Sequence, residues 1–360
     1  MQELNKAYLN KFDFKSLYLE ITSKCNGKCS YCYNDSSLLG EHIPYDKIVD
    51  IVNQAYIINP RASFVLSGGE PLLHPFFLDI LNFMHEHNSD VTVVTNASLL
   101  NNPSINKALQ KCNIQVTLES LNRKEHDSIR GVSSFENIKN LQNNIPNLYN
   151  LQRILRVNLM KKNTMHIKEF AEFAIANRYN ILSLGFLVNQ GRGRNSTEII
   201  DYEDDYNIWY NALKEIKNIT TMYEGELIVE RKNCYPRVDC ELTYLKKPSM
   251  AVRIDAKGNV FPCLYFYDPK HSMGNIYEQS LCNILKGDRF LALLDSLFYR
   301  EKNIKSCKQC IWDKHCRKGC PALAYSKHLT LNEKESCAFL KDTFEDAIKS
   351  EKPKLKEHWR

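Results

Sequence analysis

The stretch that decides the fold is residues 17–32, which read LYLEITSKCNGKCSYC. A short apolar run opens it, and three cysteines follow directly with the spacing C-x3-C-x2-C. Asn26, Gly27 and Lys28 allow the tight loop that folds three sulfurs around one centre. Three thiolates hold three irons of a cubane cluster and leave the fourth iron open, and an open position is typical of catalytic metal centres. A zinc site completed by His42 or another residue is the alternative.

Short apolar runs alternate with helix-periodic stretches in the first half of the chain. The runs suit strands buried on both faces and cover 17–21, 64–66, 91–95, 114–118, 154–160 and 181–187. The helix-periodic stretches cover 45–58, 76–87, 102–111, 135–141, 165–178 and a region around 206–216. Six strand–helix units predict a parallel sheet with functional residues at the carboxyl ends of the strands. Six units are too few for a complete eight-stranded barrel, so the pattern alone leaves a partial barrel or an open sheet.

The character of the chain changes after about Glu224. Nine of its thirteen cysteines lie between Cys234 and Cys337, which predicts a small domain held by metal rather than by a large apolar core. No apolar run is long enough for a membrane span and no secretory signal is seen, so we expect a cytoplasmic protein whose thiols bind metal. A formal charge of +6 is spread along the chain, so neither a nucleic-acid nor a membrane partner is expected.

A second motif follows the second apolar run and reads Ser67-Gly68-Gly69-Glu70-Pro71. Two glycines let the backbone approach a ligand closely, and Glu70 can accept a hydrogen bond from an ammonium group. Taken alone, the segment also fits an ordinary strand-to-helix turn.

Together the two motifs resemble the signature of the radical S-adenosylmethionine (radical SAM) superfamily. The resemblance implies that Cys25, Cys29 and Cys32 hold the cluster whose open iron binds S-adenosylmethionine. The cofactor-binding residues that it implies are Tyr31 near the adenine, Gly68, Gly69 and Glu70 at the methionyl amino group, and Asn96, Thr117 and Arg130 from softer matches. Those matches depart from the family pattern, because Ala97 stands where related enzymes have glycine and the polar positions Thr117 and Glu119 are changed.

The C-terminal cysteines resemble the SPASM extension of radical SAM enzymes, which binds two auxiliary four-iron four-sulfur clusters. Their pattern is C-x5-C, then Gly258-x4-Cys263, then C-x2-C-x5-C-x3-C and a distant last cysteine. Family wiring implies that auxiliary cluster I is held by Cys234, Cys240, Cys263 and Cys320, and auxiliary cluster II by Cys307, Cys310, Cys316 and Cys337. Two zinc-ribbon-like sites of four thiolates each are the alternative. Cys112 and Cys282 are left over, and we expect both to be small buried residues.

The resemblance implies an α/β fold, a partial (β/α)6 TIM-like barrel with a small C-terminal cysteine-rich iron–sulfur domain. The expected boundaries are 14–200 for the radical SAM partial barrel, 201–232 for a bridging region, 233–348 for the SPASM auxiliary-cluster domain and 349–360 for a basic tail.

The family implies that S-adenosylmethionine is cleaved to a 5′-deoxyadenosyl radical, which removes a hydrogen atom from an unactivated carbon. Enzymes with this extension mostly modify peptides or proteins. We therefore expect a maturase that forms a thioether or C–C cross-link, or another oxidative modification, in a ribosomally made peptide. The expected partners are the peptide, a reducing protein such as flavodoxin or ferredoxin and, because only 24 residues precede Cys25, a separate leader-binding protein or a leaderless mode.

Three other functions stay open. Anaerobic sulfatase-maturating (formylglycine-generating) enzymes have a similar ligand set but carry an aspartate as catalytic base where this chain has Leu264, and a leucine cannot take a proton. A small-molecule radical SAM dehydrogenase and a structural or sensing metalloprotein are the others. No catalytic base is assigned, and the candidate catalytic residues are Tyr265, Tyr267, Glu119 and Arg192.

Overall fold

The computed structural model describes residues 13–87, 89–194, 196–232, 242, 249–310, 313, 316, 318–335 and 337. The predicted cluster ligands Cys234 and Cys240 and the basic tail 349–360 lie outside these residues. The domain boundaries given above stay a prediction.

Six parallel strands form the first part of one large sheet, as the sequence predicts. They are β1 (Asp13–Thr22), β2 (Ser63–Gly68), β3 (Val91–Thr95), β4 (Asn113–Thr117), β5 (Arg153–Leu159) and β6 (Ile181–Phe186), and they lie side by side in chain order. Every neighbouring pair is parallel. The fold is therefore of the predicted α/β class, with a parallel sheet whose strands alternate with helices.

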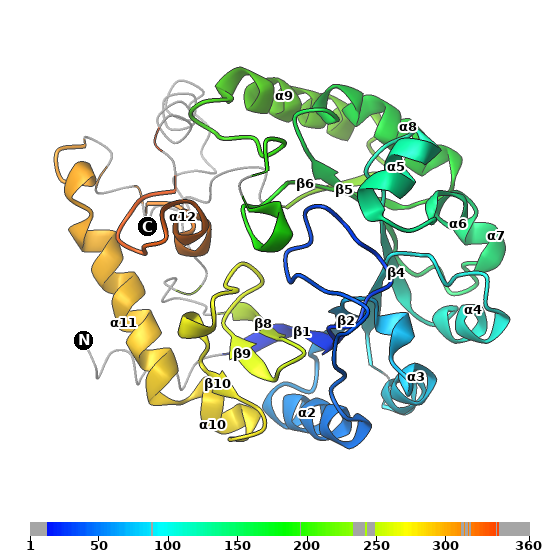
Figure 1. Ribbon diagram of the computed structural model, residues 1–360, viewed down its shortest axis with the longest axis horizontal. Helices are drawn as coiled ribbons and strands as arrows, with labels where there is room; N and C mark the ends of the chain where they lie inside the picture. Colours follow the sequence, from blue (N-terminus) through cyan, green and yellow to red (C-terminus); the bar gives the residue numbers. More distant parts are fainter. Residues whose placement is uncertain are drawn as a thin grey trace.

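Helices follow the strands and cover the outside of the sheet (Figure 1). They are α2 (Tyr45–Ile58), α3 (Phe77–Glu86), α4 (Pro103–Leu109), α5 (Arg123–Arg130), α6 (Phe135–Lys139), α7 (Leu141–Asn144), α8 (Ile167–Ala176) and α9 (Tyr206–Met222). In Figure 1 they form an arc around the strands, with the C-terminal third at its open side. No helix in the described ranges combines the length and the apolar character that a bilayer crossing needs.

Strand alternation separates the core from the interior of the barrel, because successive side chains of a strand point to opposite faces. On β1, Leu17, Leu19 and Ile21 are fully buried in the core with the apolar side chains of the surrounding helices. Leu19 is level with Leu66 of β2. Tyr18, one position away, lines the cavity inside the barrel. The same sheet thus supplies an apolar outer face and a polar inner face.

The sheet continues beyond the six strands at both ends. After α9, β7 (Ile228–Arg231) pairs in parallel with β6. On the other side β8 (Ser249–Ile254) pairs in parallel with β1, and β9 (Asn259–Phe261) and β10 (Gly274–Asn275) follow antiparallel. The C-terminal third is therefore joined to the barrel by the sheet itself.

The expectation that this third lacks a large apolar core is wrong for its described part. Helices α10 (Leu281–Leu285) and α11 (Asp288–Asn303) bury Ile284, Phe290 and Leu294 in the same core cluster as the barrel. A short helix, α12 (Pro321–His328), follows the cysteine-rich segment. The physical reason is that β8 to β10 extend the sheet and so offer these helices an apolar face to cover.

Candidate functional site

A cavity of about 330 Å³ lies at the carboxyl ends of the parallel strands. Side chains from all six strands β1 to β6 reach it, namely those of Tyr18, Ser67, Thr95, Thr117, Asn158 and Ser183. The loop after β1 and the segment after β9 close it on two sides. Parallel α/β folds build their sites at this edge, so the cavity is where the sequence predicts the functional residues.

All three cysteines of the first motif line the cavity. Their loop is held by backbone bonds from Lys28 N to Arg130 O at 3.0 Å and from Ser30 N to Ile129 O at 3.3 Å, which tie it to the end of α5. Three thiols around one cavity suit a cluster that needs three protein ligands.

Burial raises the pKa of the Cys25 thiol to about 11, and the nearby Glu70, Cys29 and Cys32 act in the same direction. Iron must therefore displace a proton that the Cys25 thiol holds firmly, so loading of the site depends on pH. His42 does not line the cavity and packs edge-on against His74 with ring centroids 5.0 Å apart. His42 is therefore not placed to complete a zinc site with the three thiols.

Gly68 and Gly69 are required by close packing against the backbone that precedes Cys25. A Cβ on Gly69 would lie 2.3 Å from Lys24 O, and one on Gly68, whose φ is +133°, would lie 2.1 Å from Thr22 O. Gly69 N donates to Thr22 O at 2.7 Å. Both glycines line the cavity next to the cysteines, so their bare backbone is exposed to a ligand where any side chain would fill the space.

Glu70 lies beneath the cavity and does not line it. Its Oε1 accepts hydrogen bonds from Thr95 Oγ1 at 2.7 Å and Leu72 N at 3.2 Å, and its Oε2 accepts from Asn96 N at 2.7 Å. Burial raises the pKa of this carboxyl to about 7, although these bonds and Arg130 favour the charged form. The carboxylate thus holds the end of β3 in place, where Asn96 faces the cavity.

Tyr31 belongs to a buried polar network on one side of Cys32. Its hydroxyl donates to Glu119 Oε1, which also accepts from Asn158 Nδ2 at 2.8 Å and lies 3.8 Å from Arg130 Nη1. Among the described residues, Glu119 Oε2 and Arg130 Nε have no hydrogen-bond partner. Glu119 is fully buried and does not line the cavity. Its carboxylate contacts Tyr31, which does line it.

Arg192 lines the cavity but is committed to the cysteine loop. Its Nε donates to Cys29 O at 3.0 Å, its Nη1 donates to Ser36 O at 2.9 Å, and the same Nη1 pairs with Asp35 Oδ1 at 2.8 Å. Arg192 holds the loop that carries the three thiols.

The segment after β9 closes the cavity opposite the cysteine loop. Leu264, Tyr265 and Tyr267 all line it. The carbonyl of Tyr265 accepts from Gln190 Nε2 at 3.0 Å. Two catalytic candidates therefore face the cavity, and a leucine occupies the wall at the position that the sulfatase-maturating alternative needs for an acid.

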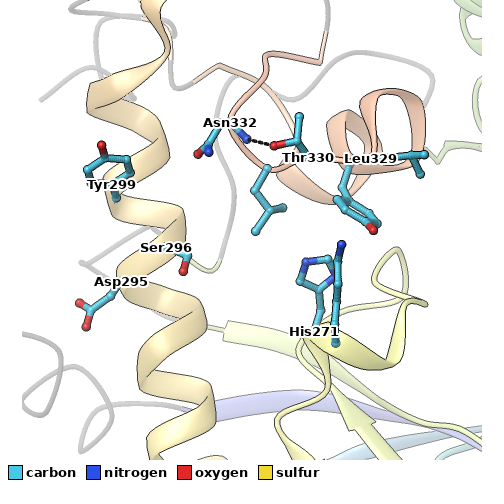
Figure 2. Close-up of a pocket in the computed structure, with 10 residues that line it drawn as sticks. His271, Asp295, Ser296, Tyr299, Leu329, Thr330 and Asn332 are labelled. Atoms are coloured by element: carbon cyan, nitrogen blue, oxygen red, sulfur yellow. Dashed lines mark hydrogen bonds between the residues drawn. The ribbon is translucent and has the colours of Figure 1, made fainter.

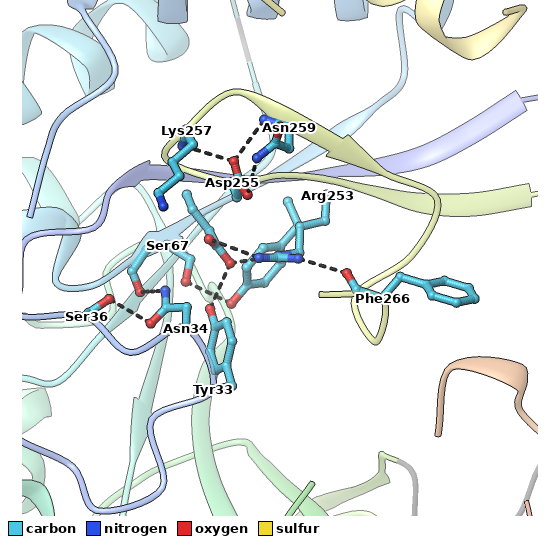
Figure 3. A network of polar contacts seen from close by, with 12 residues as sticks. Tyr33, Asn34, Ser36, Ser67, Arg253, Asp255, Lys257, Asn259 and Phe266 are labelled. Atoms are coloured by element: carbon cyan, nitrogen blue, oxygen red, sulfur yellow. Dashed lines mark hydrogen bonds and ion pairs between the residues drawn. The ribbon is translucent and has the colours of Figure 1, made fainter. Parts of the chain in front are cut away.

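Sequence reasoning missed several residues of this cavity and its support. The lining includes Tyr18, Tyr33 and Arg156, and a buried ion pair between Glu20 and Arg253 lies behind the wall (Figure 3). The strand residues could have been found by counting, because positions 18, 67, 115, 117, 156, 158 and 183 alternate with the core positions of their strands. No local sequence pattern pointed to Arg253.

Of the predicted auxiliary ligands, Cys307, Cys316 and Cys337 lie near enough to one another for their charges to interact. Burial raises the pKa of the Cys307 and Cys316 thiols, and the neighbouring Cys337 thiol raises both further. Cys320 is the N-cap residue of α12, where its N–H donates to Glu335 Oε2 at 2.6 Å. Cys310 N donates to Cys307 O at 3.0 Å. These residues do not line the main cavity.

The remaining cysteines are separate from these groups. None of the eleven described cysteines forms a disulfide. Across the described ranges, no three Cys, His, Asp or Glu side chains converge as they would on a single ion. Cys112 is fully buried, as expected, whereas Cys282 is only half-buried because the short helix α10 leaves its side chain partly open to solvent.

A second cavity, of about 770 Å³, lies in the C-terminal third between α11 and α12 (Figure 2). His271, Ser296 and Tyr325 are among the residues that line it. None of the residues predicted for catalysis, cofactor binding or cluster ligation lines this cavity, so the chemistry belongs to the first one.

The cavity, its three thiols and the parallel sheet define a radical SAM enzyme with an added iron–sulfur domain. Residues 19–174 match the family model of the radical SAM superfamily, and residues 245–311 match SPASM, an iron–sulfur cluster-binding domain. The chain belongs to the radical SAM superfamily and carries a SPASM domain. Its cofactors are S-adenosylmethionine and four-iron four-sulfur clusters, as predicted. The structural or sensing metalloprotein is therefore excluded, because members of this family are enzymes.

Relatives match over most of the chain. The antilisterial bacteriocin subtilosin biosynthesis protein AlbA of Bacillus subtilis (strain 168) is 25% identical over 343 residues, which are 91% of this chain and 72% of that protein. A cysteine-type anaerobic sulfatase-maturating enzyme of Clostridium perfringens (strain 13 / Type A) is 23% identical over an alignment of 365 positions, which covers 91% of this chain and 94% of that protein.

Solved structures share the fold. Streptococcus suis SuiB bound to the precursor peptide SuiA has a TM-score of 0.71 at 18% identity, and the match covers 94% of this chain and 79% of that chain. The enzyme anSMEcpe with bound AdoMet also has a TM-score of 0.71 at 18% identity, and the match covers 94% of each chain.

Proposed function

We propose that the protein is a peptide maturase that oxidatively modifies a residue of a ribosomally made peptide, by a thioether or C–C cross-link or a related change. The observation that carries the proposal is the two-sided cavity. One side presents Cys25, Cys29, Cys32 and the Gly68–Gly69 backbone, and the other presents side chains of the C-terminal third. A substrate group between the two sides is shielded from water and held against the cofactor.

Relatives support a peptide substrate. The similar protein AlbA is named for subtilosin biosynthesis, and SuiB, which shares the fold, was solved with its precursor peptide. Both matches extend over at least nine-tenths of this chain, so they include the residues on both sides of the cavity.

Formylglycine formation is the second candidate, because a sulfatase-maturating enzyme is equally similar in sequence. The cavity disfavours it. Leu264 lines the wall, and none of the described residues that line the cavity is Asp, Glu or His. The acid that the resemblance implies for that chemistry is therefore not supplied at its position by this chain. A small-molecule dehydrogenation has no specific support from the residues around the cavity.

The residues of the site take these roles in the proposal. Cys25, Cys29 and Cys32 hold the catalytic cluster, and Gly68 and Gly69 offer their backbone to S-adenosylmethionine. When bound, this cofactor supplies the means to remove a hydrogen atom from an unactivated carbon. The side chains of Tyr31, Asn96, Thr117 and Arg130 bind and orient it. Glu70, Glu119 and Arg192 position these groups from behind.

The C-terminal ligand set completes the proposal with two auxiliary clusters. Cluster I takes Cys263 and Cys320 together with Cys234 and Cys240, which lie outside the described residues. Cluster II takes Cys307, Cys310, Cys316 and Cys337, three of which already interact. Four thiolates close each site, so electron transfer is the role proposed for both clusters.

Partners follow from the chemistry. One electron must reach the catalytic cluster, so we propose a reducing protein such as flavodoxin or ferredoxin, and a separate leader-binding protein for peptide delivery. A cytoplasmic location is also proposed, because reduced thiols that can hold iron persist in a reducing thiol pool.

The test is a reaction with candidate peptides encoded beside the gene. The anaerobically reconstituted chain is incubated with S-adenosylmethionine, a reductant and each peptide, and products are analysed by mass spectrometry. We expect one peptide to lose two hydrogen atoms while 5′-deoxyadenosine is released, and the Cys25→Ala/Cys29→Ala/Cys32→Ala variant to do neither. Oxidation of a sulfatase-derived peptide instead, with the candidate peptides unchanged, would contradict the proposal.

A further inference from the structure

Two tyrosine rings form part of the cavity wall. Tyr33 directly follows Cys32, and Tyr267 comes from the segment after β9. Their ring centroids are 5.0 Å apart with the planes tilted by 50°. Two segments that are far apart in the sequence therefore meet at one aromatic surface inside the cavity.

A buried ion pair between Glu20 and Arg253 contacts both rings, and Tyr33 and Arg253 are labelled in Figure 3. Arg253 Nε is 2.8 Å from Glu20 Oε1 and its Nη2 is 3.3 Å from Oε2, and both side chains are at most 4% exposed. The Tyr33 hydroxyl donates to Glu20 Oε1 at 3.1 Å. The Arg253 guanidinium carbon lies 4.2 Å from the centroid of the Tyr267 ring. Glu20 thus holds Tyr33, and Arg253 holds Tyr267.

Stability alone does not account for this pair. Removing two charges from water is costly, and apolar side chains of the same volume usually stabilise a core as well or better. What a bidentate carboxylate–guanidinium pair adds is a single geometry, because both partners are planar and joined by two bonds. Arg253 Nη1 also donates to Phe266 O at 2.9 Å, which holds the backbone next to Tyr267.

The surface that the rings present is uncharged. Their neighbours in the cavity wall include Tyr18, Leu264 and Tyr265. The charge of Arg253 is neutralised by Glu20 behind the rings. A charged side chain placed against this wall would lose water and gain no opposite charge, whereas an apolar one would gain from burial against aromatic faces.

Cations elsewhere in the cavity have their own partners. Arg130 faces Glu119, Arg192 pairs with Asp35, and Lys232 pairs with Glu230 at 3.1 Å. Arg156 donates to Asn158 Oδ1 at 3.3 Å and Ser183 Oγ at 3.5 Å on the strands. None of these contacts brings a charge to the tyrosine wall.

We propose that Tyr33 and Tyr267 determine substrate specificity by binding an uncharged aromatic or aliphatic side chain of the peptide, and that the Glu20–Arg253 pair positions the two rings. The inference rests on the proposed function and adds the chemical class of the side chain that enters the cavity. Tyr33 and Tyr267 contact the substrate, whereas Glu20 and Arg253 act through them.

The test is selection of a random-sequence peptide library on the immobilised, anaerobically reconstituted full chain with S-adenosylmethionine present. Wild type is expected to enrich peptides that share one aromatic or aliphatic position. Changing that position to Asp or Lys in a synthetic copy should weaken binding by about tenfold or more. Tyr267→Phe keeps the ring and should keep the preference of about tenfold for the uncharged peptide over its Asp or Lys copy. Tyr267→Ala should reduce that preference to about twofold.

The positioning role has its own variant. Glu20→Met/Arg253→Met removes both charges without leaving one unpaired, and it should reduce the preference as Tyr267→Ala does while the dissociation constant for S-adenosylmethionine stays unchanged. A purely structural pair would leave the preference intact and so overturn the positioning role.

The possible failures separate the two proposals. No enrichment of any peptide by wild type contradicts the peptide maturase itself. If wild type enriches peptides and neither Tyr267→Ala nor Tyr33→Ala alters that enrichment, the maturase proposal stands and the specificity role of the two tyrosines is contradicted. A Tyr267-dependent preference for Asp, Glu, Lys or Arg would contradict that role in the same way.

Discussion

His126 joins two loops beneath the cofactor side of the cavity. Its Nδ1 accepts a hydrogen bond from the backbone N–H of Glu119 at 3.1 Å, and its Nε2 lies 3.0 Å from Ser134 Oγ. The ring is fully buried, and burial lowers its pKa to about 4, with Arg130 acting in the same direction. A proton on Nδ1 would face the N–H of Glu119, so the folded protein keeps this ring neutral.

The stability of the chain should therefore fall in acid through His126. The unfolded ring gains a proton near pH 6.5 and the folded ring only near pH 4. The contribution of the neutral ring to the free energy of unfolding is therefore fully present above pH 6.5 and is lost as the pH decreases toward 4. Between pH 8 and pH 5 the loss is about 2 kcal/mol. Urea unfolding of the iron-free protein at both pH values measures it.

His126→Asn is the matched variant for that measurement, because it keeps an acceptor near the Nδ1 position and does not titrate. The free energy of unfolding should decrease less between pH 8 and pH 5 in the variant than in wild type by about 2 kcal/mol. Equal decreases in the two proteins would show that the ring titrates normally in the folded state.

Individual cysteines also differ in their roles. Cys25→Ala should lower the iron content of the reconstituted chain by about four atoms per molecule, because it removes one of the three thiols that line the cavity. Cys112→Ala is the control, since Cys112 is buried in the apolar core and should leave the iron content unchanged. An equal loss in both variants would point to general misfolding.

Local sequence predicted the residues of the cavity that belong to short motifs. Cys25 and Gly69 stand in segments whose spacing is informative without the fold. Tyr33 and Arg253 could not be predicted in this way, because their contact partners are Tyr267 and Glu20, each more than 200 positions away in the sequence. The role of Glu70 was also beyond reach, because only the structure shows which donors its carboxylate meets.

At the scale of elements, long periodic segments were predictable and short or polar ones were not. The observed α2 and β3 begin and end where the apolar pattern predicts. α5 was missed because its buried residues are only His126 and Ile129, which give no apolar stripe. β9 and β10, of three and two residues, are too short for alternation to show. α11 did carry a signal, since Phe290, Leu293, Leu294 and Leu297 are buried at helical spacing.

β1 is the element on which packing depends most, because it lies between β2 and β8. Leu19→Ala should lower the free energy of unfolding by about 2–5 kcal/mol, since a fully buried side chain leaves a cavity. Leu39→Ala is the matched control because Leu39 is 94% exposed, and it should change stability by less than about 0.5 kcal/mol. Chemical denaturation of both variants measures the difference, and similar effects would contradict the placement of β1.

At the scale of the whole molecule, the barrel and the C-terminal third are one structure. The order β8-β1-β2 places a strand from the C-terminal third directly against the first strand of the barrel. The sequence did not predict this continuous sheet, because the cysteine-rich composition hides the strands that extend it. The ion pair between Glu20 of β1 and Arg253 of β8 reinforces that junction.

A double-mutant cycle measures this junction. Arg253→Met alone should destabilise the protein by about 3–5 kcal/mol, because it leaves Glu20 charged and buried without its partner. Glu20→Met/Arg253→Met should recover most of that loss, since no unpaired charge remains. Additive effects of the two single changes would show that the residues do not interact.

The central claim is that Cys25, Cys29 and Cys32 hold a cluster with one iron open to S-adenosylmethionine. The most direct measurement is the electron paramagnetic resonance spectrum of the reduced, anaerobically reconstituted chain before and after S-adenosylmethionine is added. We predict that addition changes the signal of one cluster in wild type and changes nothing in the Cys25→Ala/Cys29→Ala/Cys32→Ala variant. A wild-type spectrum that stays the same on addition would contradict the account.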